Sequence, residues 1–452
     1  NAPDSARSWL ERLSLISNEI VPLPYANSDP TLATQAGQSS TLTPISFDFV
    51  LDADNFAAPT EPQPQATASA APGDSGSDVV SPYPTTEELL SWNYAIDGFV
   101  LPRANSVVSS DIGAFVNSGF STVVLASTNV SRVVGAGPVA AIDGMKVLIT
   151  DSAASLAMDE ALGSTLDHDV TSAEHALSTA VLAARASQSS DTGSVLIMID
   201  HTLELSSARL DIALASLSES PSITLVPLTV AAAETPFAAT VADMPQVEER
   251  VADVERLFTA AQLERTFFSI AADPEALIAQ RQLALIDVLA TIPADDRAEW
   301  MTRVDEFLAD SGSLRTAVKV VKASNFLLLA DNSFLPVSVS NDLNQAVTVY
   351  ITVDPRTALL AVGDSRVELQ IPANSQAKAN VPVESLSNGV VKVEINLTSN
   401  IGLPIGGSTV TEINVQAGWE TPIVLAFGAL VVVIFGVGFV RSIVRRRKPI
   451  DD

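Results

Sequence analysis

The stretch IVLAFGALVVVIFGVGFV, residues 423–440, contains no charged or strongly polar side chain. A helix of this length at ~1.5 Å per residue covers ~27 Å, close to the ~30 Å hydrocarbon core of a bilayer. A basic cluster follows it directly, made of Arg441, Arg445, Arg446, Arg447 and Lys448. The sequence therefore predicts a transmembrane helix at 419–441 and a basic cytoplasmic tail at 442–452.

The charges around this stretch predict its orientation. Its other flank, residues 415–421, carries only Glu420 as a charged side chain. Because basic residues gather on the cytoplasmic side of a membrane, we expect the C-terminus in the cytoplasm and the N-terminal part outside the plasma membrane. The chain begins with a polar segment, so we expect either a removed signal peptide or a longer N-terminal part before residue 1.

The composition disfavours one class of partner and excludes any role for cysteine. Lys and Arg together number 25 against 53 Asp and Glu, which gives a net charge of −28. Nucleic acid is therefore an unfavourable partner, because its phosphates would be repelled. The chain has no cysteine, so it has neither a disulfide framework nor a thiolate metal site.

The longer N-terminal part alternates between apolar runs and helical segments. Apolar runs without polar alternation are typical of strands that are buried on both faces. The pattern predicts an α/β domain at 1–316, with a parallel sheet or incomplete barrel and a mobile insertion loop at 57–82, where Pro, Ala, Ser and Gly dominate. The predicted strands are 122–126, 146–150, 195–199 and 223–226.

From about residue 317 the apolar period changes to two. Val347, Val349, Ile351 and Val353 alternate with polar residues, and similar segments follow, separated by turn signals such as Asn388-Gly389. Short alternating strands at regular spacing predict an immunoglobulin-like β-sandwich at 317–418.

Several short motifs resemble a family of uncharacterised actinobacterial envelope proteins. They are Leu23-Pro24-Tyr25 with Asp29-Pro30, the segment 92–98, the sandwich entry 334–343, Gly402-Leu-Pro404-Ile-Gly406 and the Arg-rich tail. The resemblance implies a type I membrane protein with a further N-terminal β domain, encoded beside a lipid II flippase. It also implies an α/β domain similar in layout to polysaccharide deacetylases and barrel glycosidases. Trp92-Asn-Tyr94 departs from the family's Trp-Pro, which puts the role of that segment in doubt.

Polar residues just after strands are the candidate catalytic groups, because parallel sheets carry their sites at the carboxyl ends of strands. They are Asp29, Asp151, Asp200 and His201. A glycosidase needs two carboxylates either ~5 Å or ~6.5–9.5 Å apart. Asp also ends buried strands as a helix cap, and we favour the cap over the catalytic role, above all for Asp151.

The histidines do not predict a metal centre. His168, His175 and His201 show no metal-ligand spacing, and no phosphate-binding glycine loop is present. We therefore expect neither a metal nor another cofactor.

Small residues line one face of the predicted transmembrane helix. Gly428, Val432 and Gly436 lie four residues apart, which would let a second helix approach closely. The alternative is that membrane helices simply tolerate glycine. The stripe predicts contact with another integral membrane protein, and the resemblance makes the lipid II flippase the first candidate.

Three functions remain open from the sequence. The favoured hypothesis is an envelope protein whose extracytoplasmic domains bind a partner, a membrane protein or an envelope glycan, in assembly or export of the peptidoglycan precursor. The alternative is a glycoside hydrolase or polysaccharide deacetylase that acts on envelope glycans. A purely structural spacer is the third.

Overall fold

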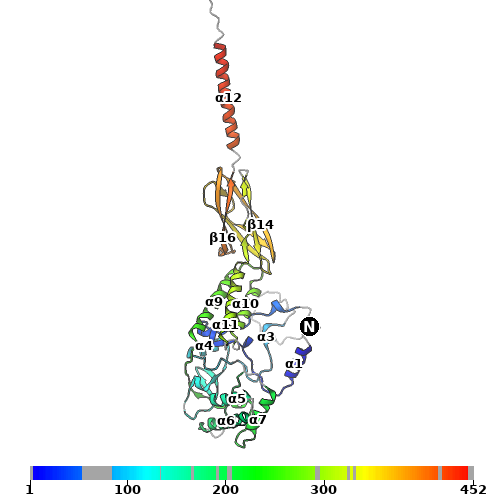
Figure 1. Cartoon of the computed structure of the whole chain (residues 1–452), viewed down its shortest axis with the longest axis vertical. Helices are drawn as coiled ribbons and strands as arrows, with labels where there is room; N and C mark the ends of the chain where they lie inside the picture. The colour runs from blue at the N-terminus through cyan, green and yellow to red at the C-terminus, as the bar shows by residue number, and fades with distance from the viewer. Residues whose placement is uncertain are drawn as a thin grey trace, which may run out of the picture. The chain divides into compact units, whose positions relative to one another are not determined.

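The computed structural model describes residues 4–52, 84–132, 134–163, 167–189, 193–200, 206–290, 296–322, 326–328, 332–415 and 420–445. The chain divides into two compact units (Figure 1). Unit 1 is Asn1–Ala261 with Ala276–Leu308, and unit 2 is Gln262–Glu275 with Ala309–Asp452. The insertion loop predicted at 57–82 lies outside the described residues.

A five-stranded sheet in the order β1-β2-β5-β4-β6 forms the centre of unit 1. Its strands are β1 (Phe99–Val100), β2 (Thr122–Ala126), β4 (Val139–Ile142), β5 (Met145–Thr150) and β6 (Phe237–Ala238). β1, β2 and β5 are parallel, whereas β4 runs antiparallel to β5. The sheet is therefore mixed, which corrects the parallel sheet predicted from the apolar runs.

The antiparallel pair has a local cause in the sequence. Asp143 and Gly144 connect β4 to β5 with φ values of 49° and 84°. An Asp-Gly pair with positive φ at both positions is the favoured two-residue connection of a β-hairpin. The hairpin adds a strand to the sheet that continuous apolar runs do not reveal.

Two of the predicted strands are not strands. Within 195–199, only Leu196 makes a β-bridge, to Thr150, and 223–226 contains no strand. In the first run, Val195, Ile197 and Ile199 pack against a helical cluster that includes Leu177 and Leu217, whereas Leu196 and Met198 pack against a sheet cluster that includes Val124 and Leu148. In the second run, Ile223 packs against the same helical cluster, and Leu225 and Val226 are exposed. Burial against helices produces the same continuous apolar pattern as burial in a sheet.

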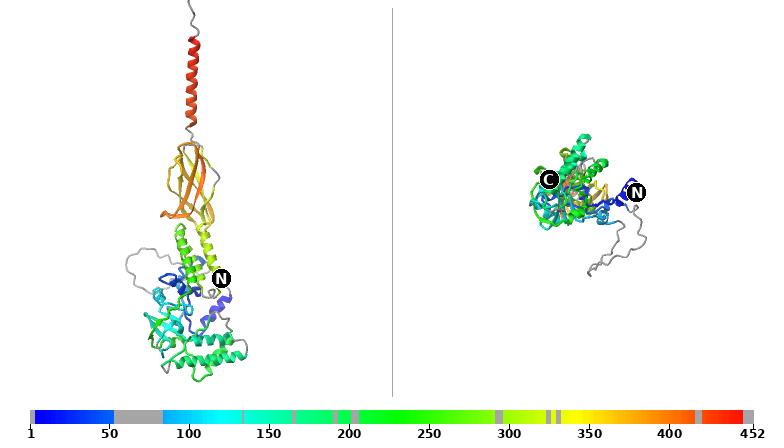
Figure 2. Two further views of the ribbon diagram at one scale, coloured as in Figure 1. Left: turned by 60° about the vertical axis from the view of Figure 1, so that its left-hand side comes forward. Right: turned by 90° about the horizontal axis from the view of Figure 1, so that it is seen from below.

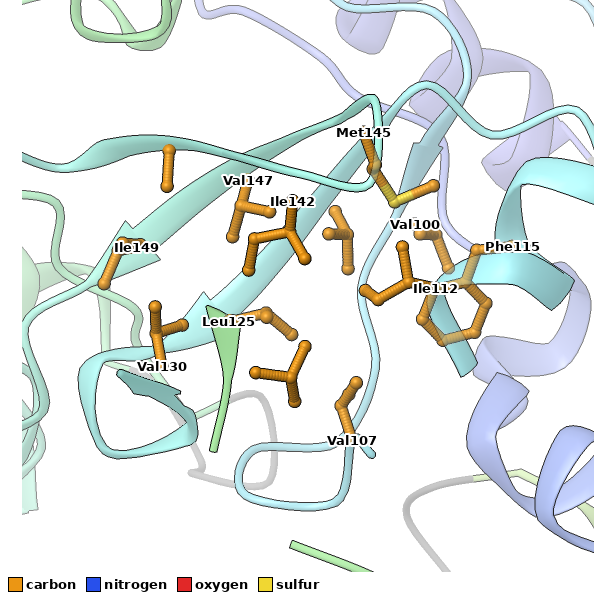
Figure 3. Close-up of a cluster of buried hydrophobic side chains, with 13 residues drawn as sticks. Val100, Val107, Ile112, Phe115, Leu125, Val130, Ile142, Met145, Val147 and Ile149 are labelled. Carbon is orange, nitrogen blue, oxygen red and sulfur yellow. The ribbon is translucent and has the colours of Figure 1, made fainter. Parts of the chain in front are cut away.

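Helices surround this sheet and lie at both ends of unit 1. Figure 3 shows how Ile112 and Phe115 of one of them reach the sheet residues Val100 and Met145 in a common core. A second core joins the long helices through Trp300, whose ring nitrogen donates to the carbonyl of Val288 at 2.9 Å. The helices are α1 (Asp4–Ser14), α2 (Pro30–Gln35), α3 (Thr86–Leu90), α4 (Ser109–Asn117), α5 (Ser152–Gly163), α6 (Asp167–Ala186), α7 (Ser207–Ser218), α8 (Leu228–Ala232), α9 (Glu248–Phe268), α10 (Pro274–Val288) and α11 (Arg297–Arg315). A short pair, β3 (Val130–Ser131) with β7 (Thr240–Val241), completes the unit.

Unit 2 contains two sheets, drawn mainly in yellow and orange in Figure 2. Their orders are β12-β14-β10-β8 and β13-β11-β15-β16-β9. In the central strands, buried residues alternate with more exposed ones, as in β11, because one face of each sheet turns to the core. The strands are β8 (Val318–Val320), β9 (Phe326–Leu328), β10 (Asn332–Asn341), β11 (Val347–Pro355), β12 (Leu360–Val362), β13 (Val367–Ile371), β14 (Ser375–Ser385), β15 (Gly389–Thr398) and β16 (Pro404–Val415).

The apolar stretch near the C-terminus forms the helix α12 (Glu420–Arg445). In the described part of the chain, no helix is both long and apolar enough to cross a membrane, which corrects the transmembrane helix predicted at 419–441.

Candidate functional site

The carboxyl ends of β1, β2 and β5 lead into the loops where a site is expected in an α/β unit. Non-glycine residues with positive φ occur in two loops of this region: Ala26 at 56°, Asn27 at 50° and Asn105 at 58°. Such conformations cost free energy in residues with a side chain, and they concentrate at functional sites. The polar groups next to these loops are therefore the candidates for a functional site.

Asp29 follows the first of these loops and is buried, with 1% of its surface exposed. It caps α2, because its Oδ1 accepts hydrogen bonds from the Thr31 N–H at 3.0 Å and the Thr31 hydroxyl at 2.7 Å. Its Oδ2 accepts from Gln246 Nε2 at 2.6 Å. Both carboxylate oxygens of Asp29 are therefore engaged inside the protein.

Asp111 is a second buried carboxylate, also 1% exposed. Its Oδ1 accepts from the Thr34 hydroxyl at 2.5 Å, and its Oδ2 accepts from Gln35 Nε2 and the Val108 N–H, each at 2.9 Å. Burial raises the pKa of Asp111 and the negative charge of Asp29 adds to the rise, while the three hydrogen bonds oppose it.

Two glutamines join these carboxylates into one network. Gln35 Nε2 donates to Asp111 and to the carbonyl of Ser106 at 2.8 Å, while Gln35 Oε1 accepts from the Gln246 N–H at 2.8 Å. Gln246 in turn donates to Asp29. The network ties α2, α4 and the segment before α9 together. Sequence reasoning missed Asp111 and both glutamines, because their partners lie far away along the chain.

Asp151 caps α5 at the end of β5, as the sequence predicts in preference to a catalytic role. Its Oδ1 accepts from the backbone N–H groups of Ala153 at 3.1 Å and Ala154 at 3.0 Å. Its own N–H donates to the carbonyl of Leu196 at 2.8 Å. The carboxylate is thus held by the first turn of the helix.

Hydroxyl groups surround this cap. Thr128 donates to Asn105 Oδ1 at 2.5 Å, and the hydroxyls of Ser127 and Ser152 lie 3.0 Å apart. These contacts join the loops that follow β1, β2 and β5. These hydrogen bonds hold the loops to one another, but they do not supply a pair of carboxylates for hydrolysis.

Asp200 lies beside Asp159, which is not one of the candidate catalytic residues from the sequence. Its N–H donates to Asp159 Oδ1 at 2.9 Å. Burial raises the pKa of Asp159, the hydrogen bond from Asp200 lowers it, and the charge of Asp200 raises it further. His201 lies outside the described residues. The carboxylate neighbours are therefore Asp111 for Asp29 and Asp159 for Asp200.

The residues predicted to contact a membrane partner lie in α12. Val432 is 71% exposed, and a Cβ added at Gly428 or Gly436 would meet nothing within 4 Å. Arg441 is exposed and Arg445 is the last residue of the helix. The remaining basic residues, Arg446, Arg447 and Lys448, lie outside the described residues.

The described ranges contain no group of three or more His, Asp or Glu residues placed to hold a metal ion.

Comparisons with known proteins give one strong match. No curated protein matches the chain. Among solved structures, E. coli alpha-2-macroglobulin matches with 16% identity and a TM-score of 0.19 over 22% of this chain, and the chain spans 7% of that protein. WR4, a C. elegans MSP family member, matches with 9% identity and a TM-score of 0.18 over 22% of this chain and 99% of its own.

These two structural likenesses are too weak to carry an argument about this chain. The family comparison is of a different kind, because one family model matches residues 24–451, nearly the whole chain. The protein therefore belongs to DUF6049, a family of unknown function.

Proposed function

We propose that this protein acts in the cell envelope by binding a partner, and that it does so in assembly or export of the peptidoglycan precursor. Binding is favoured over hydrolysis by the burial and the hydrogen bonds of Asp29. Both its oxygens accept hydrogen bonds inside the protein, and 1% of its surface is exposed.

A hydrolytic acid or base must reach the proton that it transfers, within about 3 Å or through one water. A carboxylate buried as deeply as Asp29 does not reach a glycan chain. Asp151 is more accessible, but its Oδ1 is held by two backbone N–H groups of α5. The hydrogen bonds of both groups support structural roles, and they therefore favour a binding protein over a glycosidase or deacetylase.

The class of partner rests on charge and on the resemblance to actinobacterial envelope proteins. A net charge of −28 disfavours nucleic acid and anionic polymers. The resemblance to envelope proteins favours an integral membrane protein as the partner, with the lipid II flippase as the first candidate. An envelope glycan is the second partner to test, and the proposed location is outside the plasma membrane.

Two measurements on the full chain test this proposal. In the first, the tagged chain is recovered from native membranes in mild detergent, and the flippase is detected by immunoblot. In the second, purified peptidoglycan is incubated with the chain, and the sedimented protein, released reducing ends and released acetate are measured. We expect capture of the flippase or sedimentation with peptidoglycan, without release of either product.

Two outcomes would overturn the proposal. A release of reducing ends or acetate that Asp151→Asn abolishes and Asp143→Asn leaves unchanged would establish the hydrolase. Asp143 serves as the control position because it lies in the turn between β4 and β5. Failure of both capture and sedimentation would remove the binding role. Asp143→Asn is a matched control, since asparagine suits the positive φ of 49° at that position.

A further inference from the structure

A pocket of about 470 Å³ opens in unit 2 between the end of β11 and β12. Its volume lies within the range of small-ligand sites, roughly 300–1,000 Å³. Its lining includes the apolar residues Val353, Ala358 and Leu360 and the charged residues Asp354 and Arg356.

The apolar side of the pocket consists of core residues. Val353 and Leu360 are 4% and 3% exposed and belong to different sheets, so the pocket lies where the two layers meet. This side is fixed by the packing of unit 2 and offers contact to a small aliphatic group.

Two strand edges border the pocket. β11 pairs with β13 only up to Ile351, whereas its pairing with β15 continues to Pro355. β12 pairs with β14 alone and is the last strand of its sheet. Among the described residues, neither edge has a further strand partner. Free strand edges present backbone N–H and C=O groups, which peptides bind by adding to the edge.

The rim of the pocket carries one charge of each sign. Arg356 is held in place, because its Nη2 donates to Glu394 Oε2 at 2.6 Å and its backbone N–H donates to the backbone carbonyl of Lys392 at 2.9 Å. A guanidinium has five N–H donors, so this ion pair leaves donors for a ligand carboxylate. Among the described residues, the carboxylate of Asp354 accepts one long hydrogen bond, from Asn396 Nδ2 at 3.5 Å.

We propose that this pocket binds the C-terminal end of a short peptide with small aliphatic side chains. Arg356 receives the terminal carboxylate, Asp354 accepts a hydrogen bond from a peptide N–H, and Val353 and Leu360 contact the side chains. The inference rests on the proposed function for the source of the ligand, because a peptidoglycan precursor carries a peptide. Peptides cut from proteins have the same chemistry, and the configuration of the residues separates the two sources.

Calorimetric titration of the full chain tests the ligand class with four probes. They are D-alanyl-D-alanine, L-alanyl-L-alanine, and two derivatives of whichever dipeptide binds more tightly, its C-terminal amide and its N-acetyl form. We expect binding of the free dipeptide and of its N-acetyl form, which keeps the peptide N–H, and about a tenfold or larger loss for the amide, because the amide lacks the charge-assisted contact with Arg356. Tighter binding of the D,D form identifies a wall peptide, whereas tighter binding of the L,L form identifies a protein-derived peptide. Equal affinity for the free and the amidated forms, or no binding of any probe, overturns the proposal.

Three variants locate the binding. Arg356→Gln should weaken the free dipeptide about tenfold and abolish the preference for the acid over the amide. Lys392→Gln is the matched control, since Lys392 is an exposed cation of the neighbouring strand that contacts Glu412 at 3.6 Å and does not line the pocket. Ala358→Phe fills the pocket from an exposed position and should abolish binding with an unchanged Tm. Normal binding by Arg356→Gln and Ala358→Phe would contradict the assignment.

Failure of this inference is distinguishable from failure of the proposed function. If no dipeptide binds while the flippase or peptidoglycan is still captured, only the pocket assignment falls. If dipeptides bind with the expected variant pattern and capture fails, the pocket assignment stands, and the peptide must have another source.

Discussion

Asp29 and Asp151 are both helix caps, but they differ in what else depends on them. Asp29→Ala removes the cap of α2, leaves the buried Thr31 hydroxyl without its acceptor, and takes from the half-buried Gln246 amide one of its two acceptors. We expect a loss of about 2–4 kcal/mol in the free energy of unfolding, about 1 from the cap and the rest from unsatisfied buried donors. Asp151→Ala removes a cap alone and should cost about 1 kcal/mol.

Urea unfolding followed by circular dichroism measures both variants under one set of conditions. A loss for Asp29→Ala no larger than that for Asp151→Ala would show that the network around Asp29 adds nothing to the cap. A glycan-releasing activity that disappears in both variants at unchanged stability would contradict the structural roles altogether.

Asp111 gives the stability a pH dependence of defined sign. Its pKa is raised in the folded protein above the ordinary value of 3.8, chiefly by burial. The folded state therefore holds this proton more tightly, so the contribution of Asp111 to stability is fully present below pH 3.8 and is lost as pH rises through the folded pKa.

The difference in unfolding free energy between the wild type and Asp111→Asn isolates this contribution. We expect this difference to shrink between about pH 4 and pH 7, because asparagine does not titrate and all other carboxylates are shared. Urea midpoints across this range provide the measurement. A difference that grows with pH would mean that the hydrogen bonds outweigh burial and that the pKa is lowered.

At the scale of elements, the sequence predicts strands where the apolar run and the flanking turns agree. The runs 122–126 and 146–150 match β2 and β5, and Asp151 caps α5, as its place directly after the second run predicts. Partners are harder to predict, because Asp111 contacts Thr34 from 77 residues away and Gln246 contacts Asp29 from 217 residues away. No local pattern encodes such contacts, so the caps were predictable and the network was not.

Two glycines in different elements should respond to alanine with opposite signs. Gly113 lies inside α4, where an added Cβ meets nothing within 4 Å, so Gly113→Ala should stabilise by about 0.5–1 kcal/mol. Gly144 has equal space but a φ of +84° in the turn between β4 and β5. Gly144→Ala should therefore destabilise by about 1 kcal/mol, because a side chain disfavours that conformation.

The two alanine variants serve as controls for each other, since both add one methyl group to open space. Their urea midpoints should move in opposite directions from the wild type. Midpoints that move the same way would show that the backbone conformation is not what distinguishes these positions.

At the scale of the whole molecule, the dominant property is the excess of 53 acidic over 25 basic residues. Like charges repel one another in the compact state, and salt screens this repulsion, with a Debye length of roughly 30 Å at 0.01 M and 3 Å at 1 M. Screening should therefore stabilise the folded protein. A gain of about 1 kcal/mol in the free energy of unfolding corresponds to a rise in Tm of about 2–4 °C for a domain of roughly 150–250 residues.

Thermal unfolding at pH 7 in 10 mM and 500 mM sodium chloride measures this effect. We expect Tm to rise with salt, and the rise to shrink toward pH 4 as carboxylates become protonated and the net charge falls. Attractive ion pairs act in the opposite direction, since screening weakens them, and Lys319 with Asp342 at 2.8 Å is such a pair. A Tm that falls with added salt at pH 7 would show that local pairs outweigh the net charge, and the acidic surface would then not govern how this protein meets its partners.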